Sequence, residues 1–292
     1  MKQQFITKKF HRSSLELIQT CEGILDDYER QGFDLTLRQL YYQLVARDLI
    51  PNSQKSYSRL GSIVNDARLA GLLDWSMIVD RGRRTVANQH WNNPAEIVRA
   101  AARSFRVDHW ADQPVHIEVM IEKQALEGIL QPVCSDLDVN LTANKGYSSQ
   151  SFMYRKGRSL RYELNADKAV HLFYLGDHDP SGLDMDRDIE ERLTMFSGHP
   201  VTVKRLALTY PQIEEFNPPE NPAKLTDSRA AEYIAQYGSS SWELDALEPA
   251  ALADLVRGEV EALRDPDIYD QTLMREENMK ETLNLWADSY ED

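Results

Sequence analysis

The chain has 292 residues, 42% of them hydrophobic, which is enough for two compact hydrophobic cores. Its net charge of −14 argues against a protein that binds nucleic acid over its whole surface. The acid is unevenly distributed: residues 1–110 contain 16 basic and 12 acidic residues, whereas residues 111–292 contain 17 and 35. A local basic face in the first part of the chain is therefore compatible with the composition.

The cysteine count and the hydropathy pattern exclude further classes of protein. The two cysteines, Cys21 and Cys134, are too few and too far apart for a disulfide framework or a zinc-binding pattern. The amino terminus lacks an apolar signal segment, and no run approaches the roughly 20 apolar residues of a membrane helix. We therefore expect a cytoplasmic protein that does not contact membranes.

The first part of the chain predicts a helical module. Apolar residues at helical spacing indicate an amphipathic helix over residues 13–31. Thr36, with Gln39 three residues later, forms a capping box that predicts the start of a second helix. Its buried face is expected to consist of Leu37, Leu40, Tyr41 and Leu44. Arg38 and Tyr42 are four residues apart on another face, so their side chains should be neighbours, and the alternative for Tyr42 is an ordinary half-exposed tyrosine.

Two further segments of this module are candidates for contacts with DNA. A third helix is predicted over residues 53–73, and one side of it carries polar residues every three positions, as a helix facing a DNA groove would. These residues are Arg59, Ser62, Asn65 and Arg68. Residues 78–86 predict a short hairpin whose basic tip suits phosphate contacts. The tip contains Arg81, Arg83 and Arg84. A solvated charged surface is the alternative for both segments.

Strands alternate with helices between residues 115 and 208, which predicts a parallel sheet with right-handed crossovers. Strands are expected at residues 115–121, 138–143, 169–175 and 201–208, and helices at residues 124–133, 149–164 and 181–196. A basic patch lies between the second and third of these strands. Its candidates for DNA binding are Lys145 and Arg155, accompanied by Lys156, Arg158 and Arg161.

Acidic residues follow two of the predicted strands. Glu122 ends the strand 115–121, and Asp177 and Asp179 follow the strand 169–175. Residues two apart in an extended backbone point the same way, so the two aspartates should emerge side by side. Carboxylates this close repel each other unless a cation lies between them, and hard oxygen ligands suit Mg²⁺. Because parallel strands end at one edge of a sheet, Glu122 can join the pair. The alternative is a strand-to-helix turn in which the aspartates cap the helix.

Residues 211–292 contain 20 acidic and 6 basic residues and predict acidic amphipathic helices. A helical layer that covers the sheet is the expected role of this tail. A surface that mimics DNA or docks a partner is the alternative.

Four short motifs together resemble those of one family, the A subunit of topoisomerase VI and its relative, the meiotic double-strand-break transesterase. The motifs are Arg38-Gln39-Leu40-Tyr41-Tyr42, Ile121-Glu122-Lys123, Lys145-Gly146-Tyr147 and Asp177-His178-Asp179-Pro180-Ser181-Gly182. Glu122 and the last motif are also similar to the glutamate and the Asp-x-Asp-x-x-Gly of the Toprim domain, an Mg²⁺ module of topoisomerases, primases and some nucleases. His178 departs from the small or apolar residue expected there. His178 could be a further metal ligand or a phosphate contact. We expect instead that it is an exposed side chain without such a role.

The resemblance implies an α/β multi-domain fold. Residues 1–110 would form a winged-helix DNA-binding domain with a connector, in which the hairpin at 78–86 is the wing. Residues 111–210 would form a Rossmann-like Toprim domain with the parallel sheet. Residues 211–292 would be an acidic helical extension.

The resemblance also implies an activity, topoisomerase VI A-like cleavage of double-stranded DNA. Tyr42 would attack a phosphodiester and leave a covalent 5′-phosphotyrosine, and Arg38 would lower the cost of forming the phenolate. Glu122, Asp177 and Asp179 would hold Mg²⁺, or Mn²⁺, and Glu122 is alternatively a proton shuttle. In the family the protein is a homodimer, the tyrosine of one protomer meets the metal site of the other, and a separate ATPase B-type subunit supports strand passage.

Two alternatives to this activity stay open. In the first, Tyr42 is structural and the protein is a Toprim endonuclease that cuts DNA with metal-activated water. In the second, the protein is a non-catalytic DNA-binding or adaptor module.

Overall fold

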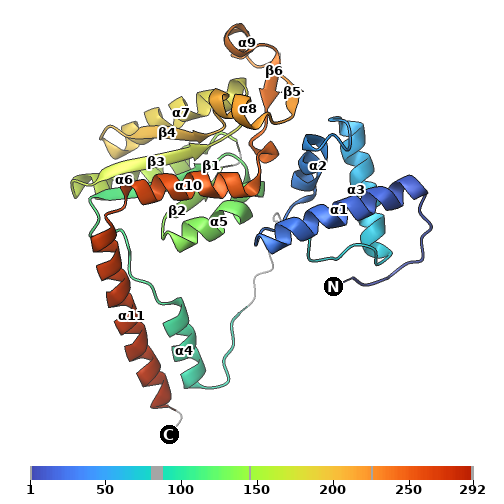
Figure 1. The fold of residues 1–292 in the computed structure, drawn as a ribbon. Helices are drawn as coiled ribbons and strands as arrows, with labels where there is room; N and C mark the ends of the chain where they lie inside the picture. The colour runs from blue at the N-terminus through green and yellow to red at the C-terminus, as the bar shows by residue number, and fades with distance from the viewer. Residues whose placement is uncertain (1, 80–87, 145, 225, 291–292) are drawn as a thin grey trace.

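The computed structural model describes residues 2–79, 88–144, 146–224 and 226–290. This part of the chain contains eleven α-helices and a four-stranded parallel sheet, as the sequence predicts for an α/β protein. Three amino-terminal helices form a bundle beside the sheet. Two helices that are far apart in the sequence, α4 (Pro94–Ser104) and α11 (Pro266–Asp288), project together from the sheet's other end (Figure 1).

The bundle consists of α1 (Arg12–Arg30), α2 (Leu37–Ala46) and α3 (Gln54–Leu69), all three of which the sequence predicts. The capping box is present: the Thr36 hydroxyl accepts from the Gln39 backbone N–H, and the Gln39 side chain accepts from the Thr36 N–H at 2.8 Å. The core between the helices includes Cys21, Leu40 and Leu60. The basic tip with Arg81, Arg83 and Arg84 lies outside the described residues, so the hairpin stays a prediction.

The sheet has the strand order β2 (Asn140–Ala143), β1 (Val115–Ile121), β3 (Ala169–Leu175) and β4 (Thr202–Ala207), and all neighbours are parallel. The predicted strands are thus confirmed, with ends that differ by two residues at most. β1 and β3 pair along their whole length, from Val115 opposite Ala169 to Ile121 opposite Leu175. The ends of these two strands therefore lie side by side at the centre of the sheet's carboxyl edge.

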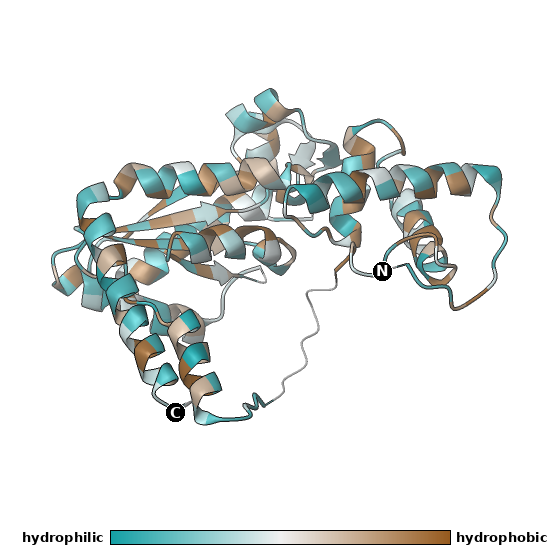
Figure 2. Ribbon diagram, turned by 60° about the horizontal axis from the view of Figure 1, so that its bottom comes forward, coloured by the Kyte–Doolittle hydropathy of each residue, from teal (hydrophilic) through white to brown (hydrophobic). Residues whose placement is uncertain are grey.

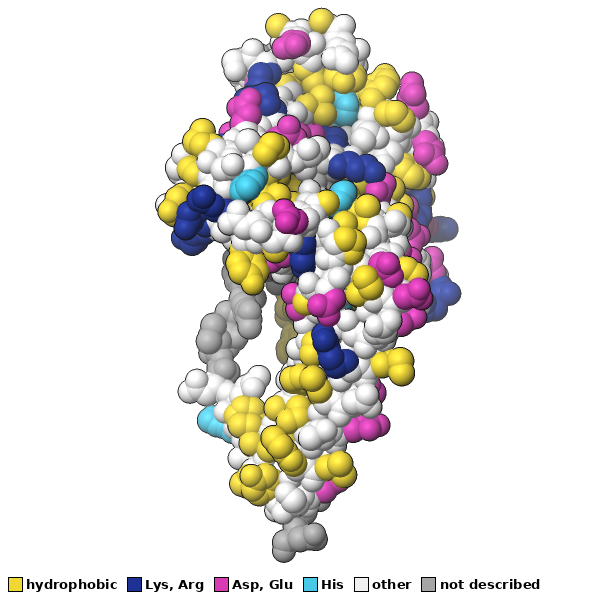
Figure 3. Space-filling model, turned by 90° about the vertical axis from the view of Figure 1, so that its left-hand side faces the viewer, with side chains coloured by type: hydrophobic (Ala, Val, Ile, Leu, Met, Phe, Trp, Pro, Cys, Tyr) yellow, Lys and Arg dark blue, Asp and Glu magenta, His cyan; other side chains and the backbone are white. Residues whose placement is uncertain are grey.

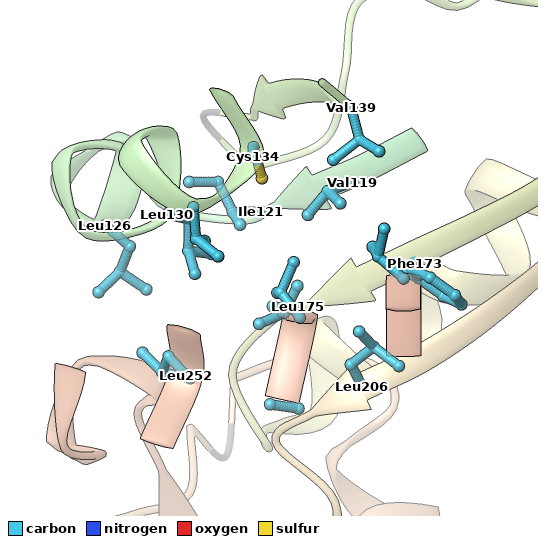
Figure 4. Packing of buried hydrophobic residues seen from close by; sticks show 14 of the residues in the cluster. Val119, Ile121, Leu126, Leu130, Cys134, Val139, Phe173, Leu175, Leu206 and Leu252 are labelled. Carbon is cyan, nitrogen blue, oxygen red and sulfur yellow. The ribbon is translucent and has the colours of Figure 1, made fainter. Parts of the chain in front are cut away.

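Helices cover both faces of the sheet. One face, with Val119, Phe173 and Leu175, packs against η1 (Gln124–Leu126), α5 (Glu127–Asp136) and α10 (Pro249–Leu263) (Figure 4). The other face, with Met120 and Tyr174, packs against α6 (Gln150–Asn165) and α7 (Pro180–Ser197). The alternation follows from the strand geometry, which points successive side chains to opposite faces.

The last third of the chain forms a separate two-stranded hairpin and a helix that covers one face of the sheet. After β4 come α8 (Tyr210–Phe216), β5 (Glu220–Pro222), α9 (Ala230–Tyr237), β6 (Ser240–Trp242) and the 3₁₀ turn η2 (Leu244–Ala246). β5 and β6 pair antiparallel, and α10 then buries Leu252, Val256 and Val260 against the sheet. The helical layer expected of the tail is therefore present as α10.

The final helix, α11 (Pro266–Asp288), packs along α4 (Pro94–Ser104), which belongs to the segment between the bundle and the sheet. The pair projects as an arm (Figures 1 and 2). Hydrophobic side chains gather on its surface (Figure 3), and they include Ile97, Met274, Leu285 and Trp286. Within the described ranges, no helix has the combination of length and apolarity needed to cross a bilayer.

Candidate functional site

Glu122 and Asp177 meet at the carboxyl edge of the sheet. Glu122 directly follows β1, and Asp177 follows β3 after Gly176. The backbone N–H of Asp177 donates to Glu122 Oε2 at 2.8 Å. A Cβ at Gly176 would lie 2.8 Å from that oxygen and 2.6 Å from the Tyr174 ring, so a larger residue here would displace the Glu122 carboxylate or the buried Tyr174 ring.

Asp179 has a different role from Asp177 in this arrangement. It is the N-cap of α7, and its Oδ1 accepts from the Gly182 N–H at 2.6 Å and from the Ser181 hydroxyl at 2.8 Å. Its other oxygen lies 3.6 Å from the ammonium group of Lys224. The helix-capping interpretation of the sequence is thus confirmed for Asp179.

Lys123 is the centre of an ion-pair network that sequence reasoning missed. Its Nζ lies 2.9 Å from Asp177 Oδ2, 3.0 Å from Glu243 Oε2 and 3.6 Å from Asp245 Oδ2. Glu243 and Asp245 are two residues apart and follow the short strand β6, which is the same pattern as Asp177 and Asp179 after β3. That repeated pattern was the signal available in the sequence.

The helix with Arg38 and Tyr42 docks onto this network within the same chain. Arg38 forms an ion pair with Glu243, and its Nε lies 3.3 Å from Asp245 Oδ2. The Arg38 guanidinium lies 5.8 Å from the centre of the Tyr42 ring, so the predicted proximity of these two side chains is confirmed. Tyr42 itself is 4% exposed rather than half-exposed, because the segment around Glu243 covers that face of α2.

Tyr42 lines a polar pocket of about 400 Å³. Its walls come from α2, from α3 and the residues just before it, from β5 and from the residue after β6, and they include Tyr41, Asn52, Tyr57, Asn221 and Glu243. Burial raises the pKa of Tyr42 to about 12; the negative charge of Glu243 adds to the rise, and Arg38 opposes it. Tyr42 is therefore a neutral phenol near neutral pH.

Glu122 is the carboxyl group of the site whose pKa lies near neutrality. Burial raises its pKa to about 7, and the charge of Asp177 adds to the effect. Burial also raises the pKa of Asp177, against the opposing charge of Lys123. A carboxyl group with a pKa near 7 can both accept and donate a proton under physiological conditions.

Asp245 is a buried carboxylate that lies near two cations but accepts no hydrogen bond from the described residues. It is 2% exposed, and neither of its oxygens finds a hydrogen-bond donor among the residues that the structure describes. The positive charges of Arg38 and Lys123 at 3.3 and 3.6 Å accompany it instead. Asp245 therefore depends on these two cations for its charge compensation, since a buried carboxylate requires nearby positive charge.

The donors expected to hold Mg²⁺ fit the ion in chemistry but are not assembled around one point. Glu122, Asp177 and Asp179 supply the carboxylate oxygens that Mg²⁺ prefers. Among the described residues, however, no three His, Cys, Asp or Glu side chains converge as a metal site. Asp177 is engaged by Lys123 and by the Leu244 N–H, and Asp179 caps α7. The metal site stays a prediction.

The candidate DNA-binding residues are in different situations. Arg59 and Arg155 are exposed, on α3 and α6 respectively. Arg68 instead donates to the Trp75 carbonyl at 2.7 Å and stacks 4.4 Å from the Trp75 ring centre, which gives it a structural role. Lys145 lies outside the described residues.

The expectation of an exposed His178 is wrong. His178 is 1% exposed, and its Nδ1 lies 2.9 Å from the Tyr233 hydroxyl. Its ring packs among Tyr210, Tyr237 and Trp242, and its backbone N–H and C=O pair with Trp242. Burial and the charge of Arg205 lower the pKa of His178 to about 4, so it is a neutral packing residue that anchors the β5–β6 hairpin.

Arg205, on β4, holds the loop that carries Asp177. Its guanidinium pairs with Asp186 at 2.7 Å and donates to the carbonyls of Gly176, Asp177 and Gly182 at 3.1, 3.2 and 2.6 Å. We expect Arg205→Met to lower the free energy of unfolding by about 3 kcal/mol, because it leaves Asp186 and these carbonyls without their donor. Urea denaturation measures this change.

Arg187→Met is the matched control, because Arg187 lies on α7 and forms surface ion pairs with Asp184 and Glu191. Such exposed pairs contribute about 0.5 kcal/mol or less. Equal losses for the two variants would contradict the role assigned to Arg205.

The Glu243 ion pairs predict a loss of stability in acid. Burial opposes ionisation of Glu243, but the charges of Lys123 and Arg38 outweigh it and lower the pKa from 4.5 to about 2. The pairs therefore stabilise the fold above pH 4.5, and their contribution is lost as the pH falls toward 2. We expect the free energy of unfolding to fall between about pH 6 and pH 2 for both proteins. The fall should be larger for the wild type than for Glu243→Gln, by up to about 3 kcal/mol. Parallel pH profiles would contradict the assignment.

Comparison of the chain with protein families, with characterised proteins and with solved structures finds no match, so the function of this site is argued from its geometry.

Proposed function

We propose that the chain cleaves double-stranded DNA by transesterification, with Tyr42 as the nucleophile. One observation carries the proposal: ion pairs connect the helix of Tyr42 to the acidic strand ends, through Arg38, Glu243 and Lys123 to Asp177. Tyr42, Arg38 and Glu243 line one pocket, and ion pairs connect Glu243 through Lys123 to Asp177. The proposal includes a winged-helix fold for the bundle and a Toprim fold for the sheet domain.

The reaction balances without a further reactant. The Tyr42 oxygen forms a bond to phosphorus, the bond from phosphorus to the 3′-oxygen breaks, and the phenolic proton ends on that oxygen. The products are a 5′-phosphotyrosine and a free 3′-hydroxyl. Glu122 would help to hold the metal ion or, alternatively, would carry the proton from the phenol to the 3′-oxygen, and in the metal-free protein its pKa of about 7 suits the second role. Arg38 beside the ring lowers the cost of the phenolate.

In this proposal Mg²⁺ or Mn²⁺ would be held by Glu122, Asp177 and Asp179 and would neutralise charge on the phosphoryl oxygens. Exposed arginines such as Arg59 and Arg155 would contact the DNA backbone. Strand passage after cleavage would need a separate ATPase subunit, as in the family that the motifs resemble.

One observation favours a second candidate, a nuclease that uses activated water. Tyr42 is buried, and its pKa is raised to about 12, which makes the phenolate costly near neutral pH. The two functions differ in their products, since hydrolysis leaves no protein on the DNA.

The experiment is incubation of supercoiled plasmid with the protein and Mg²⁺ or Mn²⁺, stopped with SDS and analysed with and without protease. Nicked or linear DNA whose mobility changes on protease treatment supports transesterification. Cleaved DNA with free ends supports the hydrolytic nuclease, and intact DNA under both metals would contradict both.

We also propose that one chain supplies both Tyr42 and the carboxylates, since the ion pairs that join them are intramolecular. A mixture of Tyr42→Phe and Asp177→Asn proteins should then cleave no better than either variant alone. Recovery of cleavage toward one quarter to one half of the wild-type rate would instead support a homodimer with sites shared between chains, roughly as random subunit exchange predicts.

A further inference from the structure

Glu243 holds two cations that come from separate parts of the fold. Arg38 belongs to α2 of the bundle, and Lys123 follows β1 of the sheet. Glu243 forms an ion pair with Arg38, and its Oε2 lies 3.0 Å from Lys123 Nζ. The carboxylate also lines the pocket that contains Tyr42, and a quarter of the Glu243 side chain is exposed. An anion from solution can therefore reach the place that this carboxylate occupies.

The chemistry of this place suits a phosphodiester. A guanidinium and an ammonium group are the side chains that most often bind phosphate oxygens. A phosphodiester carries one negative charge, as a carboxylate does, so an exchange of one for the other leaves the charge of the site unchanged. The exchange would also bring the phosphorus atom into the pocket of Tyr42.

The surroundings allow Glu243 to leave without unfolding the turn. The next residue, Leu244, is fully buried, and its N–H donates to Asp177 Oδ1 at 2.8 Å, which fixes the backbone. The buried Asp245 lies 3.3 Å from Arg38 and 3.6 Å from Lys123, so both cations keep a counter-charge when Glu243 is displaced. The contacts that hold the backbone of this turn therefore do not depend on the Glu243 side chain.

We propose that Arg38 and Lys123 form the binding site for the DNA phosphodiester, and that Glu243 fills this site in the free protein as an internal mimic of the substrate. The inference rests on the proposed function, because it identifies where the reacting phosphate binds. DNA must then displace Glu243 before Tyr42 can act, which keeps the free protein inactive.

The test compares the affinity of Glu243→Gln and wild-type protein for a short duplex oligonucleotide, in EDTA, by fluorescence anisotropy. Removal of the internal competitor should lower Kd by at least about fivefold. Glu215→Gln is the matched control, because Glu215 is an exposed residue of α8 and its replacement changes the net charge equally. The control should change Kd by less than about twofold.

A double variant locates the effect. The higher affinity of Glu243→Gln for DNA should disappear when Lys123→Met is added, because the phosphate then loses one of its two cations. Equal affinities of Glu243→Gln and Glu215→Gln would overturn the inference, and so would a gain that survives Lys123→Met. Thermal unfolding of each variant verifies that it is folded.

A measurement on the wild-type protein keeps the inference testable if a variant does not fold. Carbodiimide coupling of carboxylates, followed by mass spectrometry, should label Glu243 more strongly when the duplex is present, because the displaced side chain faces solvent. Unchanged or weaker labelling would overturn the inference.

The outcomes separate this inference from the proposed function. Cleavage by the wild type together with unchanged binding by Glu243→Gln would overturn only the phosphate site. Tighter binding by Glu243→Gln without cleavage under Mg²⁺ or Mn²⁺ would support the phosphate site and contradict the proposed chemistry.

Discussion

Replacement of Tyr42 by Phe is expected to reduce DNA cleavage by at least about 1,000-fold and to leave DNA binding unchanged. The substitution removes only the hydroxyl oxygen that would bond to phosphorus. The ring would keep its edge-to-face contact with Tyr41, whose centroid is 5.3 Å away, and its proximity to Arg38. The variant therefore tests the role of the hydroxyl in the reaction while it keeps the contacts of the ring that support the fold. Gel assays of plasmid cleavage, with anisotropy for binding, measure the two effects.

Tyr57→Phe is the control for this prediction. Tyr57 lines the same pocket and packs against Tyr41 at 5.3 Å, so its loss of a hydroxyl perturbs the pocket in a comparable way. We expect this variant to cleave at close to the wild-type rate. If Tyr42→Phe cleaves DNA at the wild-type rate and leaves free DNA ends, the prediction is contradicted and the protein is a hydrolytic nuclease.

Asp177→Asn is expected to reduce cleavage by at least about 100-fold under both Mg²⁺ and Mn²⁺. The amide keeps the size of the side chain and an oxygen that can accept from the Leu244 N–H, which Asp177 Oδ1 does at 2.8 Å. It loses the negative charge that faces Lys123 and that would bind the metal ion. Calorimetric titration with Mn²⁺ should show weaker binding in parallel with the loss of cleavage.

Asp254→Asn provides the comparison, because Asp254 is exposed on α10 and its replacement removes the same charge. This variant should bind Mn²⁺ and cleave DNA as the wild type does. Mn²⁺ binding by Asp177→Asn that equals the wild type would exclude Asp177 as a ligand and would favour a non-catalytic role for the acidic cluster.

Local patterns were sufficient to predict the three helices of the bundle, the four parallel strands with the helices between them, and the meeting of Glu122 with Asp177, but not the β5–β6 hairpin. Periodicity and caps are properties of neighbouring residues, and adjacent parallel strands must end at one edge. The pair Arg38 and Tyr42 was also predictable, because four residues separate them on one helix.

Contacts between distant segments could not be predicted in this way. His178 is buried because Tyr233 and Trp242, more than 50 residues later, fold over it. Tyr42 is buried because the turn with Glu243, some 200 residues later, docks on α2. Periodicity shows that a helix face is polar, but it does not show whether that face meets water or another charged segment.

The ion pairs of Glu243 give the site its distinctive property. Separate segments of the chain supply the candidate nucleophile, the cations and the acidic strand ends, and one carboxylate joins them. In our proposal the same carboxylate occupies the place of the substrate phosphate. In this proposal Glu243 therefore stabilises the free protein and at the same time weakens its binding of DNA.

The most direct test of the account is to trap the intermediate with a radiolabelled duplex oligonucleotide, Mn²⁺ and SDS, and to map the labelled peptide by mass spectrometry. We predict a nucleotide joined through its 5′-phosphate to Tyr42, and no adduct in Tyr42→Phe. Cleaved oligonucleotide with no label on the protein, or a label on another residue, would contradict the account.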